Sequence, residues 1–297
     1  MRRWTRFAVL MALIGFGAAK PSGSISAEAE VSSYRTVQPR YGESRIGQTV
    51  LVYVAEDMNR DTRIKVEDYA NTPQGQRLRV LKLNRSLHFT TGAYDYSVMT
   101  SVFSALEPGF CGGILCPAKI SIAVSEWCGN FYQQLLPDSA GASRTMHSYF
   151  EAEGDKEDYL AAPSPSLYED SLPVLIRELE GEFLRVGEKR EYNILPSLWE
   201  SRITHRPLAF EKGSVEKVAD TLAVQGREAE PVFKWTWHVG NRVVTYWTEK
   251  KYPHYIVRWR SSTGESAERI KTVHVAFWQH NKNIDGYLRQ ELGLSVP

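Results

Sequence analysis

The chain has 297 residues, of which 42% are hydrophobic and 24% are charged, a composition that excludes a globally disordered protein. Its 36 basic and 35 acidic side chains give a net charge of +1, so we expect no nucleic-acid partner. The 8 Trp, 15 Tyr and 11 Phe residues favour strands around a broad core or an apolar cavity.

The N-terminal residues have the pattern of a Sec-type signal peptide. Three arginines precede an apolar run from Phe7 to Ala19, which is too short to span a membrane. Small residues allow cleavage after Ala19 or after Ala29, so residues 1–29 are the predicted signal peptide. We therefore expect a periplasmic or secreted protein whose mature chain has no transmembrane span.

The mature chain is predicted to be mainly β, an antiparallel fold of two β-rich lobes with a few short helices. Alternation of polar and apolar residues, with turn signals between the runs, carries this prediction. In the N-terminal lobe, residues 30–160, the expected strands are Gln48–Ala55, Arg63–Glu67, Leu78–Phe89, Tyr94–Phe103, Ala118–Ser125, Phe131–Leu136 and Thr145–Glu151.

The C-terminal lobe, residues 161–297, is predicted to contain an open half-barrel-like sheet. Its clearest element is a hairpin in which the turn residues Gly240 and Asn241, which tolerate positive φ, join two strands. The expected strands are Pro231–Val239, Arg242–Glu249, Tyr255–Arg260 and Ile270–Gln279, and the expected helices run from Ser171 to Gly181 and from Asp285 to Leu292. The stretch Ala161–Ser166 is the predicted linker between the lobes.

One face of this hairpin is rich in aromatic residues. Residues two apart point to the same side of a strand, so Phe233, Trp235 and Trp237 share a face with Tyr246 of the partner strand. Such a face either packs against a helix and the core or forms a pocket for lipid or another apolar ligand. These four residues are the candidate ligand-binding residues.

Three cysteines are present, and an oxidising compartment favours pairing. We predict a disulfide between Cys111 and Cys116, which leaves Cys128 as the odd thiol. Cys128 is either a nucleophile that works with Glu126 and a distant histidine such as His147, or a small buried side chain, and we favour the buried one. The histidines show no metal-ligand spacing, so no metal and no cofactor is expected.

Several phrases resemble a group of exported proteins of unknown function that are often mislabelled "septum formation inhibitor Maf". The phrases are Arg40-Tyr41-Gly42-Glu43, Val80-Leu81-Lys82-Leu83-Asn84, Thr91-Gly92-Ala93-Tyr94-Asp95-Tyr96-Ser97-Val98-Met99, Glu126-Trp127-Cys128-Gly129, Tyr252-Pro253-His254 and Ile256-Val257-Arg258-Trp259. True Maf proteins are cytoplasmic nucleotide pyrophosphatases of α/β fold, and the chain lacks their N-terminal motif. The C-terminal half is similar to the open half-barrel of the periplasmic lipoprotein carrier LolA, a likeness of fold alone.

From these patterns we expect an exported, non-catalytic protein that binds an apolar or amphipathic component of the cell envelope, such as a lipid or a lipoprotein. One alternative is an exported hydrolase or transferase that uses Cys128 and Glu126. Another is a structural envelope protein that acts through protein contacts.

Overall fold

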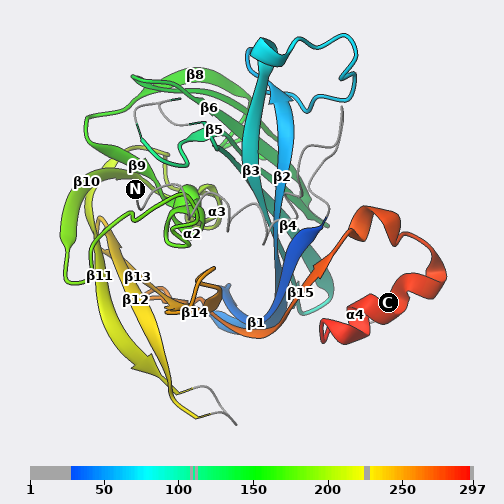
Figure 1. Cartoon of the computed structure of the whole chain (residues 1–297), viewed down its shortest axis with the longest axis vertical. Coiled ribbons are helices and arrows are strands. Elements are labelled where there is room, and N and C mark those ends of the chain that lie inside the picture. The colour runs from blue at the N-terminus through cyan, green and yellow to red at the C-terminus, as the bar shows by residue number, and fades with distance from the viewer. Residues whose placement is uncertain (1–27, 108–109, 111–112, 224–227, 295–297) are drawn as a thin grey trace, which may run out of the picture.

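The computed structural model describes residues 28–107, 110, 113–223 and 228–294. Within these residues, one curved, open sheet of 15 strands has the order β8-β7-β6-β5-β4-β3-β2-β1-β15-β14-β13-β12-β11-β10-β9 (Figure 1). Neighbouring strands are antiparallel, apart from the short parallel pair of β9 and β10. The prediction of a mainly β, antiparallel chain with a few short helices is confirmed.

The strands are longest in the N-terminal half of the chain. They are β1 (Ala29–Arg40), β2 (Glu43–Asn59), β3 (Arg77–Thr91), β4 (Tyr94–Ala105), β5 (Pro117–Glu126), β6 (Gly129–Pro137), β7 (Gly141–Ser148), β8 (Lys156–Ala161), β9 (Ser166–Tyr168), β10 (Lys189–Leu195), β11 (Glu211–Leu222), β12 (Glu230–Val239), β13 (Arg242–Glu249), β14 (Ile256–Ser261) and β15 (Ser266–Val275). The helices are η1 (Gln74–Gln76), η2 (Glu169–Ser171), α2 (Leu172–Leu175), α3 (Leu198–Thr204), η3 (Phe277–Gln279), η4 (Asn283–Gly286) and α4 (Tyr287–Glu291).

The first strand joins the two predicted lobes. β1 pairs with β2 on one side and with β15 on the other, so residues 30–160 and 161–297 contribute neighbouring strands to one sheet. The two ends of the sheet contact each other: the Tyr168 hydroxyl of the edge strand β9 donates a hydrogen bond to the Gly141 carbonyl of β7, the neighbour of the other edge strand, over 2.8 Å. The sheet thus curls until its two ends are close together (Figure 1). That the two segments are separate domains stays a prediction.

The register of the predicted hairpin is confirmed. Trp237 pairs with Val244, and Trp235 pairs with Tyr246. Gly240 in the turn has a φ of 54°, a left-handed conformation that glycine adopts without steric cost. A two-residue turn fixes the pairing of every residue beyond it, and therefore the sequence alone was enough to place these side chains on one face.

Several of the predicted elements are wrong in extent or type. The strand expected over Ile270–Gln279 ends at Val275, where η3 follows, and the strand expected to reach Glu151 ends at Ser148. Residues 63–67 form no strand, and Lys65 makes only an isolated bridge to Met58, because Arg63 has a φ of 55° that interrupts extended backbone. The helix expected from Ser171 to Gly181 ends at Leu175, and Glu178 has a φ of 46°. Helix α3 and strands β1, β8, β9, β10 and β11 were not predicted.

The concave face of the sheet is filled by the chain itself. Residues 169–184 and 196–208, which we call the inner cover, contain α2 and α3 and lie inside the curve of the sheet (Figure 1). Their apolar side chains, among them Leu172, Ile176 and Leu198, are almost fully buried in the main core cluster with residues of both halves of the sheet. The core of the protein therefore lies between the inner cover and the concave face.

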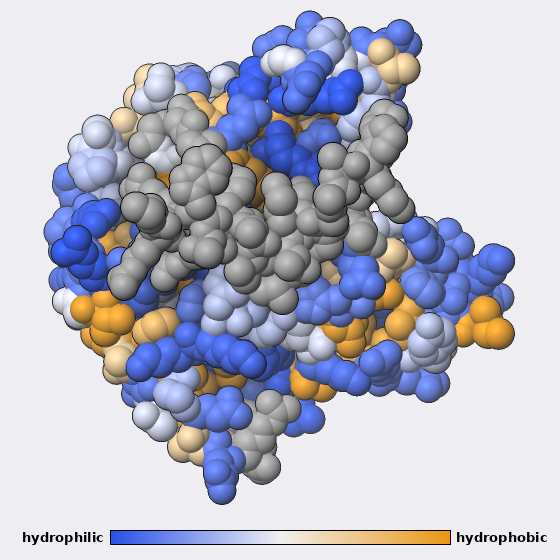
Figure 2. Space-filling view, in the orientation of Figure 1, coloured by the Kyte–Doolittle hydropathy of each residue, from blue (hydrophilic) through white to orange (hydrophobic). Residues whose placement is uncertain are grey.

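Part of the convex face is covered by the C-terminal segment. Leu292 and Leu294 pack against Val31 and Val54, and the Ser33 hydroxyl donates to the Leu292 carbonyl over 2.5 Å. Figure 2 shows hydrophobic residues on this projecting segment within a mainly hydrophilic surface, and its Ile284 is 80% exposed. Among the described residues, no helix has the length and apolar character needed to cross a membrane.

Candidate functional site

The predicted aromatic face lies on the concave side of the sheet, beneath the inner cover. Trp235, Trp237 and Tyr246 are buried, and Phe233 is partly buried against the same cluster. The Trp235 ring stacks on Phe183 of the inner cover, with ring centroids 6.1 Å apart. Of the two interpretations of this face, the structure therefore shows packing against the core. Ligand binding by these residues stays a prediction, and it would require the inner cover to move.

Aromatic rings continue this face across the sheet. Trp237 stacks on Tyr246 at 4.7 Å, and Tyr246 stacks on Trp259 of β14 at 5.4 Å. Beyond them, Tyr34 of β1 lies 4.8 Å from Trp259. Burial raises the pKa of the Tyr34 and Tyr246 hydroxyls far above the ordinary value, so both stay neutral. The rings form a packed layer and leave little free space.

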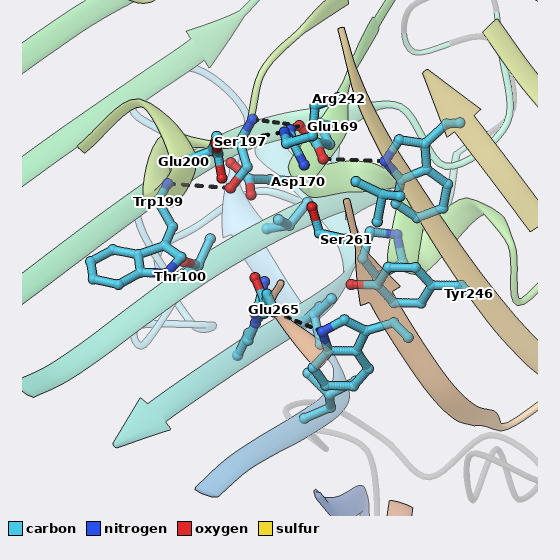
Figure 3. A pocket seen from close by; sticks show the side chains of 18 residues that line it. Thr100, Glu169, Asp170, Ser197, Trp199, Glu200, Arg242, Tyr246, Ser261 and Glu265 are labelled. Atoms are coloured by element: carbon cyan, nitrogen blue, oxygen red, sulfur yellow. Dashed lines mark hydrogen bonds and ion pairs between the residues drawn. The ribbon is translucent and has the colours of Figure 1, made fainter. Parts of the chain in front are cut away.

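A small cavity lined by both charged and apolar side chains separates this layer from the inner cover (Figure 3). Its volume is about 40 Å³, which suffices for a few water molecules, whereas drug-sized ligands occupy pockets of about 300–1,000 Å³. Glu169 accepts hydrogen bonds from the Trp237 indole over 3.2 Å and from the Ser197 amide over 2.8 Å, and it pairs with Arg242. The cavity is therefore a polar joint between the cover and the sheet.

Acidic groups outnumber basic groups around this cavity. Four carboxylates and two guanidinium groups line it, namely Glu169, Asp170, Glu200, Glu265, Arg85 and Arg242. Burial and the neighbouring Glu169 raise the pKa of Asp170 to about 6, although the Leu198 amide donates to its carboxylate over 2.9 Å. Burial also raises the pKa of Glu200. We therefore expect Asp170 to change its protonation state near pH 6.

Buried ion pairs fasten the inner cover to the sheet elsewhere. Arg177 forms two 2.8 Å hydrogen bonds with the carboxylate of Glu30 at the start of β1. On the opposite side, Lys217 of β11 contacts Glu178 over 2.6 Å. Such pairs contribute little net stability because both ions lose their hydration, but each strongly disfavours any arrangement that separates the partners. They hold the cover in one position.

The three residues of the predicted catalytic alternative are not brought together. Glu126 ends β5 with its side chain on the buried side, where it pairs with Arg202 over 3.3 Å. His147 of β7 is paired with Tyr132 and points to the opposite, exposed side, where it lies 3.5 Å from Asp155. Residues on opposite faces of a sheet cannot share a proton directly.

The prediction that Cys128 is buried is wrong. Cys128 is a free, exposed thiol in the two-residue turn between β5 and β6, because a turn at the rim of a sheet projects its side chains into solvent. His147 lies opposite Tyr132, four residues along β6 from Cys128, which corresponds to an offset of about 13 Å. Cys111 lies outside the described residues, so its disulfide with Cys116 stays a prediction.

A second hollow lies on the convex face of β4 to β7, and we call it the outer groove. Its volume is about 530 Å³, within the range of small-molecule sites. Outward-pointing side chains line it, including Met99, Ala123, Tyr132 and Tyr149, with His147 and Asp155 at one end. Met99 is 39% exposed and Tyr149 is 79% exposed, so the apolar wall of the groove is open to solvent.

Sequence reasoning missed this groove although the signal was present. Met99, Ala123 and Tyr132 occupy the exposed positions of strands whose alternate residues are buried. Apolar residues at such positions break the usual alternation of a sheet with one solvated face. No sequence pattern, however, indicates that the C-terminal segment covers β1, β2 and β15 and leaves β4 to β7 uncovered.

Comparisons with known proteins give no further information about these sites. No family model, no curated protein and no solved structure matches the chain. The resemblance to the mislabelled exported proteins and to LolA therefore stays a prediction. Among the described residues, no group of three or more His, Cys, Asp or Glu side chains is placed to hold a metal ion.

Proposed function

We propose that the chain is an exported, non-catalytic protein that binds an apolar or amphipathic component of the cell envelope, a lipid or a lipoprotein, in the outer groove. The observation that carries this proposal is the groove of about 530 Å³ with exposed apolar side chains. The concave cavity, at about 40 Å³, is too small for an acyl chain while the inner cover is in place. Binding at the outer groove needs no such rearrangement.

The lining of the groove supports an amphipathic ligand. Met99 and the rings of Tyr132 and Tyr149 supply apolar area, and Met adapts its shape to irregular ligands. The polar end holds His147 and Asp155, which can hydrogen-bond a head group. A ligand with an apolar body and a polar end matches both parts.

The separation of Cys128, Glu126 and His147 supports binding over catalysis. A nucleophile needs a base within hydrogen-bond reach, about 2.6–3.2 Å. Cys128 lies in a turn at the rim, while His147 lies about 13 Å along the sheet by strand register. Glu126 is engaged by Arg202 on the other face.

Fluorescence titration with a dansyl-labelled fatty acid tests the binding site. We expect the wild-type protein to bind this probe and Ala123→Trp, which fills the groove, to weaken binding at least about tenfold. Ser143→Trp is the matched control. Ser143 of β7 is exposed, as Ala123 of β5 is, but it lies outside the groove. If the wild type does not bind the probe, or if both variants bind it equally, the groove is not the site.

Intact-mass measurement of the protein recovered from the envelope tests export. We expect cleavage after Ala19, since Ala29 is fully buried, begins β1 and pairs with Val275. Cleavage after Ala29 would remove that residue from the sheet and place a charged amino group next to the Glu30–Arg177 pair. Recovery of the full-length chain would contradict the proposal of export.

A further inference from the structure

Three hairpin turns converge at one end of the sheet. The turns between β1 and β2, between β3 and β4, and between β5 and β6 lie at the same end because these strands are consecutive and antiparallel. Each brings an aromatic residue that solvent reaches: Tyr41, Tyr94 and Trp127, which we call the aromatic rim. Trp127 is 75% exposed and Tyr41 is 58% exposed. The rim is distinct from the outer groove and does not depend on its proposed ligand.

The rings of the aromatic rim are held in place by one another. The centroids of Trp127 and Tyr94 are 6.2 Å apart with an angle of 32° between the ring planes. The Tyr94 hydroxyl donates to the Tyr41 hydroxyl over 3.2 Å, and the Tyr41 and Tyr96 hydroxyls are 2.9 Å apart. Ordered rings lose little conformational entropy when a ligand stacks on them.

Arg40 supports the rim from below. Its guanidinium lies 4.2 Å from the centre of the Tyr41 ring and donates to the Ile203 carbonyl of α3 over 3.1 Å. Tyr41 itself has a φ of 56°, a left-handed conformation that is unfavourable for a bulky side chain. The network holds Tyr41 in a conformation that it would otherwise avoid, which is a common feature of binding sites.

Charges around the rim are balanced. Below the rings, Arg202 contacts the carboxylates of Glu126 and Glu153 within 3.3 Å, and Arg40 contacts the hydroxyls of Tyr41 and Tyr96. Next to the turns, Arg45 pairs with Glu43, so cations and carboxylates alternate around the rings and do not form a cluster of one sign. A ligand for this surface therefore offers a flat apolar face and neutral hydroxyl groups.

We propose that the aromatic rim binds a neutral saccharide, one ring of which stacks on Trp127 and Tyr94. A pyranose presents C–H bonds on its faces, which the negative face of an aromatic ring attracts, and hydroxyl groups around its edge. The hydroxyls of Tyr41 and Tyr94 lie beside the stacking surface, where they can exchange hydrogen bonds with the sugar.

Calorimetric titration with the neutral trisaccharide triacetylchitotriose tests the proposal. We expect the wild type to bind with a dissociation constant in the millimolar range or below and Trp127→Ala and Tyr94→Ala each to weaken binding about tenfold or more. Tyr287→Ala is the matched control, because Tyr287 is 52% exposed on α4, far from the rim in sequence. Circular dichroism melts confirm that all the variants fold.

Acrylamide quenching gives an independent measurement, since bound sugar shields Trp127 in the wild type. Absence of saccharide binding by the wild type, or equal binding by Trp127→Ala, would overturn the proposal. So would protection of Trp127 by phosphatidylglycerol vesicles without protection by the sugar, because the rim would then contact a lipid surface. Concentration-dependent burial of Trp127 in a dimer would also overturn it.

Discussion

The two faces of the curved sheet both carry aromatic side chains, but they use them differently. On the concave face, Trp235 and Trp237 lie beneath the inner cover, and their indole N–H groups donate hydrogen bonds to Thr248 and Glu169. On the convex face of β4 to β7, Tyr132 and Tyr149 line an open groove. The difference arises from connecting segments, since the strands of both regions have the same alternation. Aromatic content alone therefore does not indicate a binding surface.

The inner cover also shows where this protein places its buried charges. Arg177, Glu178 and Arg202 belong to the cover, and each pairs with a residue of the sheet. In an apolar interface such pairs define one position and penalise every other. Among the described residues that line the outer groove, the charged pair is that of His147 and Asp155, which is exposed and screened by water. The concave face is thus built for fixed packing, whereas the convex face of β4 to β7 stays open to solvent.

Removal of one tryptophan from each region gives the largest expected contrast. Trp235→Ala should lower the free energy of unfolding by about 3–5 kcal/mol, because it leaves a large cavity in the core. Trp127→Ala should lower it by less than about 0.5 kcal/mol, because that side chain is mostly exposed. Urea unfolding of both variants measures the difference. Equal losses would mean that the concave face is not covered in solution.

The pair of Lys217 and Glu178 tests the fastening of the inner cover. Lys217→Met should destabilise the protein by about 2–3 kcal/mol, since it leaves the Glu178 carboxylate buried without its cation. The loss is limited because the amides of Phe183 and Leu184 still donate to that carboxylate. Combining Lys217→Met with Glu178→Gln should recover about 1 kcal/mol or more in a double-mutant cycle. Simple additivity would show that the two residues do not interact.

Asp170 in the small cavity should make stability depend on pH. Folding raises the pKa of this carboxyl from 3.8 to about 6, so the unfolded state binds fewer protons between these values. The stabilising contribution of its protonated form is therefore complete below about pH 4 and is lost as the pH rises through about 6.

Asp170→Asn imitates the protonated form and keeps an acceptor for the Leu198 amide. We expect it to stabilise the protein by about 1–2 kcal/mol at pH 8, less than the full shift because the side chain is partly exposed, and to have little effect at pH 4. Chemical unfolding at both pH values measures this. Asp158→Asn is the control: Asp158 is exposed and its pKa is lowered, mainly by hydrogen bonds from Arg144, so this change should have the opposite sign at pH 8.

The sequence predicted what depends on neighbours along the chain. The hairpin at Gly240 and Asn241 was placed correctly because turn type and side-chain alternation are local. The inner cover was not, because α2 has four residues and α3 has seven, too few for a helical period to be recognised. Its attachment also joins distant residues, such as Arg177 and Glu30. This attachment decides which face of the sheet is covered and which is open to solvent. The sequence alone therefore could not distinguish the outer groove from the covered face.

The convergence of three turns at the aromatic rim was equally hidden, although the phrases containing Tyr41, Tyr94 and Trp127 were recognised. The strand β1 was not predicted, and without it Arg40-Tyr41-Gly42 is not identified as a hairpin turn. Once β1 is placed, the alternation of hairpins sends the three turns to one end of the sheet. A single missing strand therefore concealed the relation between residues that had already been singled out.

The smallest expected effect concerns Tyr41 and leaves stability almost unchanged. Slight burial opposes ionisation of its hydroxyl, but hydrogen bonds from Tyr94 and Tyr96 and the charge of Arg40 outweigh it and lower its pKa below 10.0. In Tyr94→Phe one donor is lost, so the pKa of Tyr41 should rise towards the ordinary value. The ultraviolet absorbance of phenolate, measured as the difference between each protein and its Tyr41→Phe counterpart, isolates this titration.

Tyr287→Phe is the control for this titration, because Tyr287 is exposed on α4, outside the hydrogen bonds among Tyr41, Tyr94 and Tyr96. This change should leave the Tyr41 titration unchanged. A Tyr41 that titrates at or above 10 in the wild type would show that the three hydroxyls do not converge in solution. The aromatic rim would then lack the order that distinguishes it from aromatic residues scattered on the surface. If instead the pKa of Tyr41 is lowered in the wild type and rises in Tyr94→Phe, the contrast between the two faces extends to the ends of the strands.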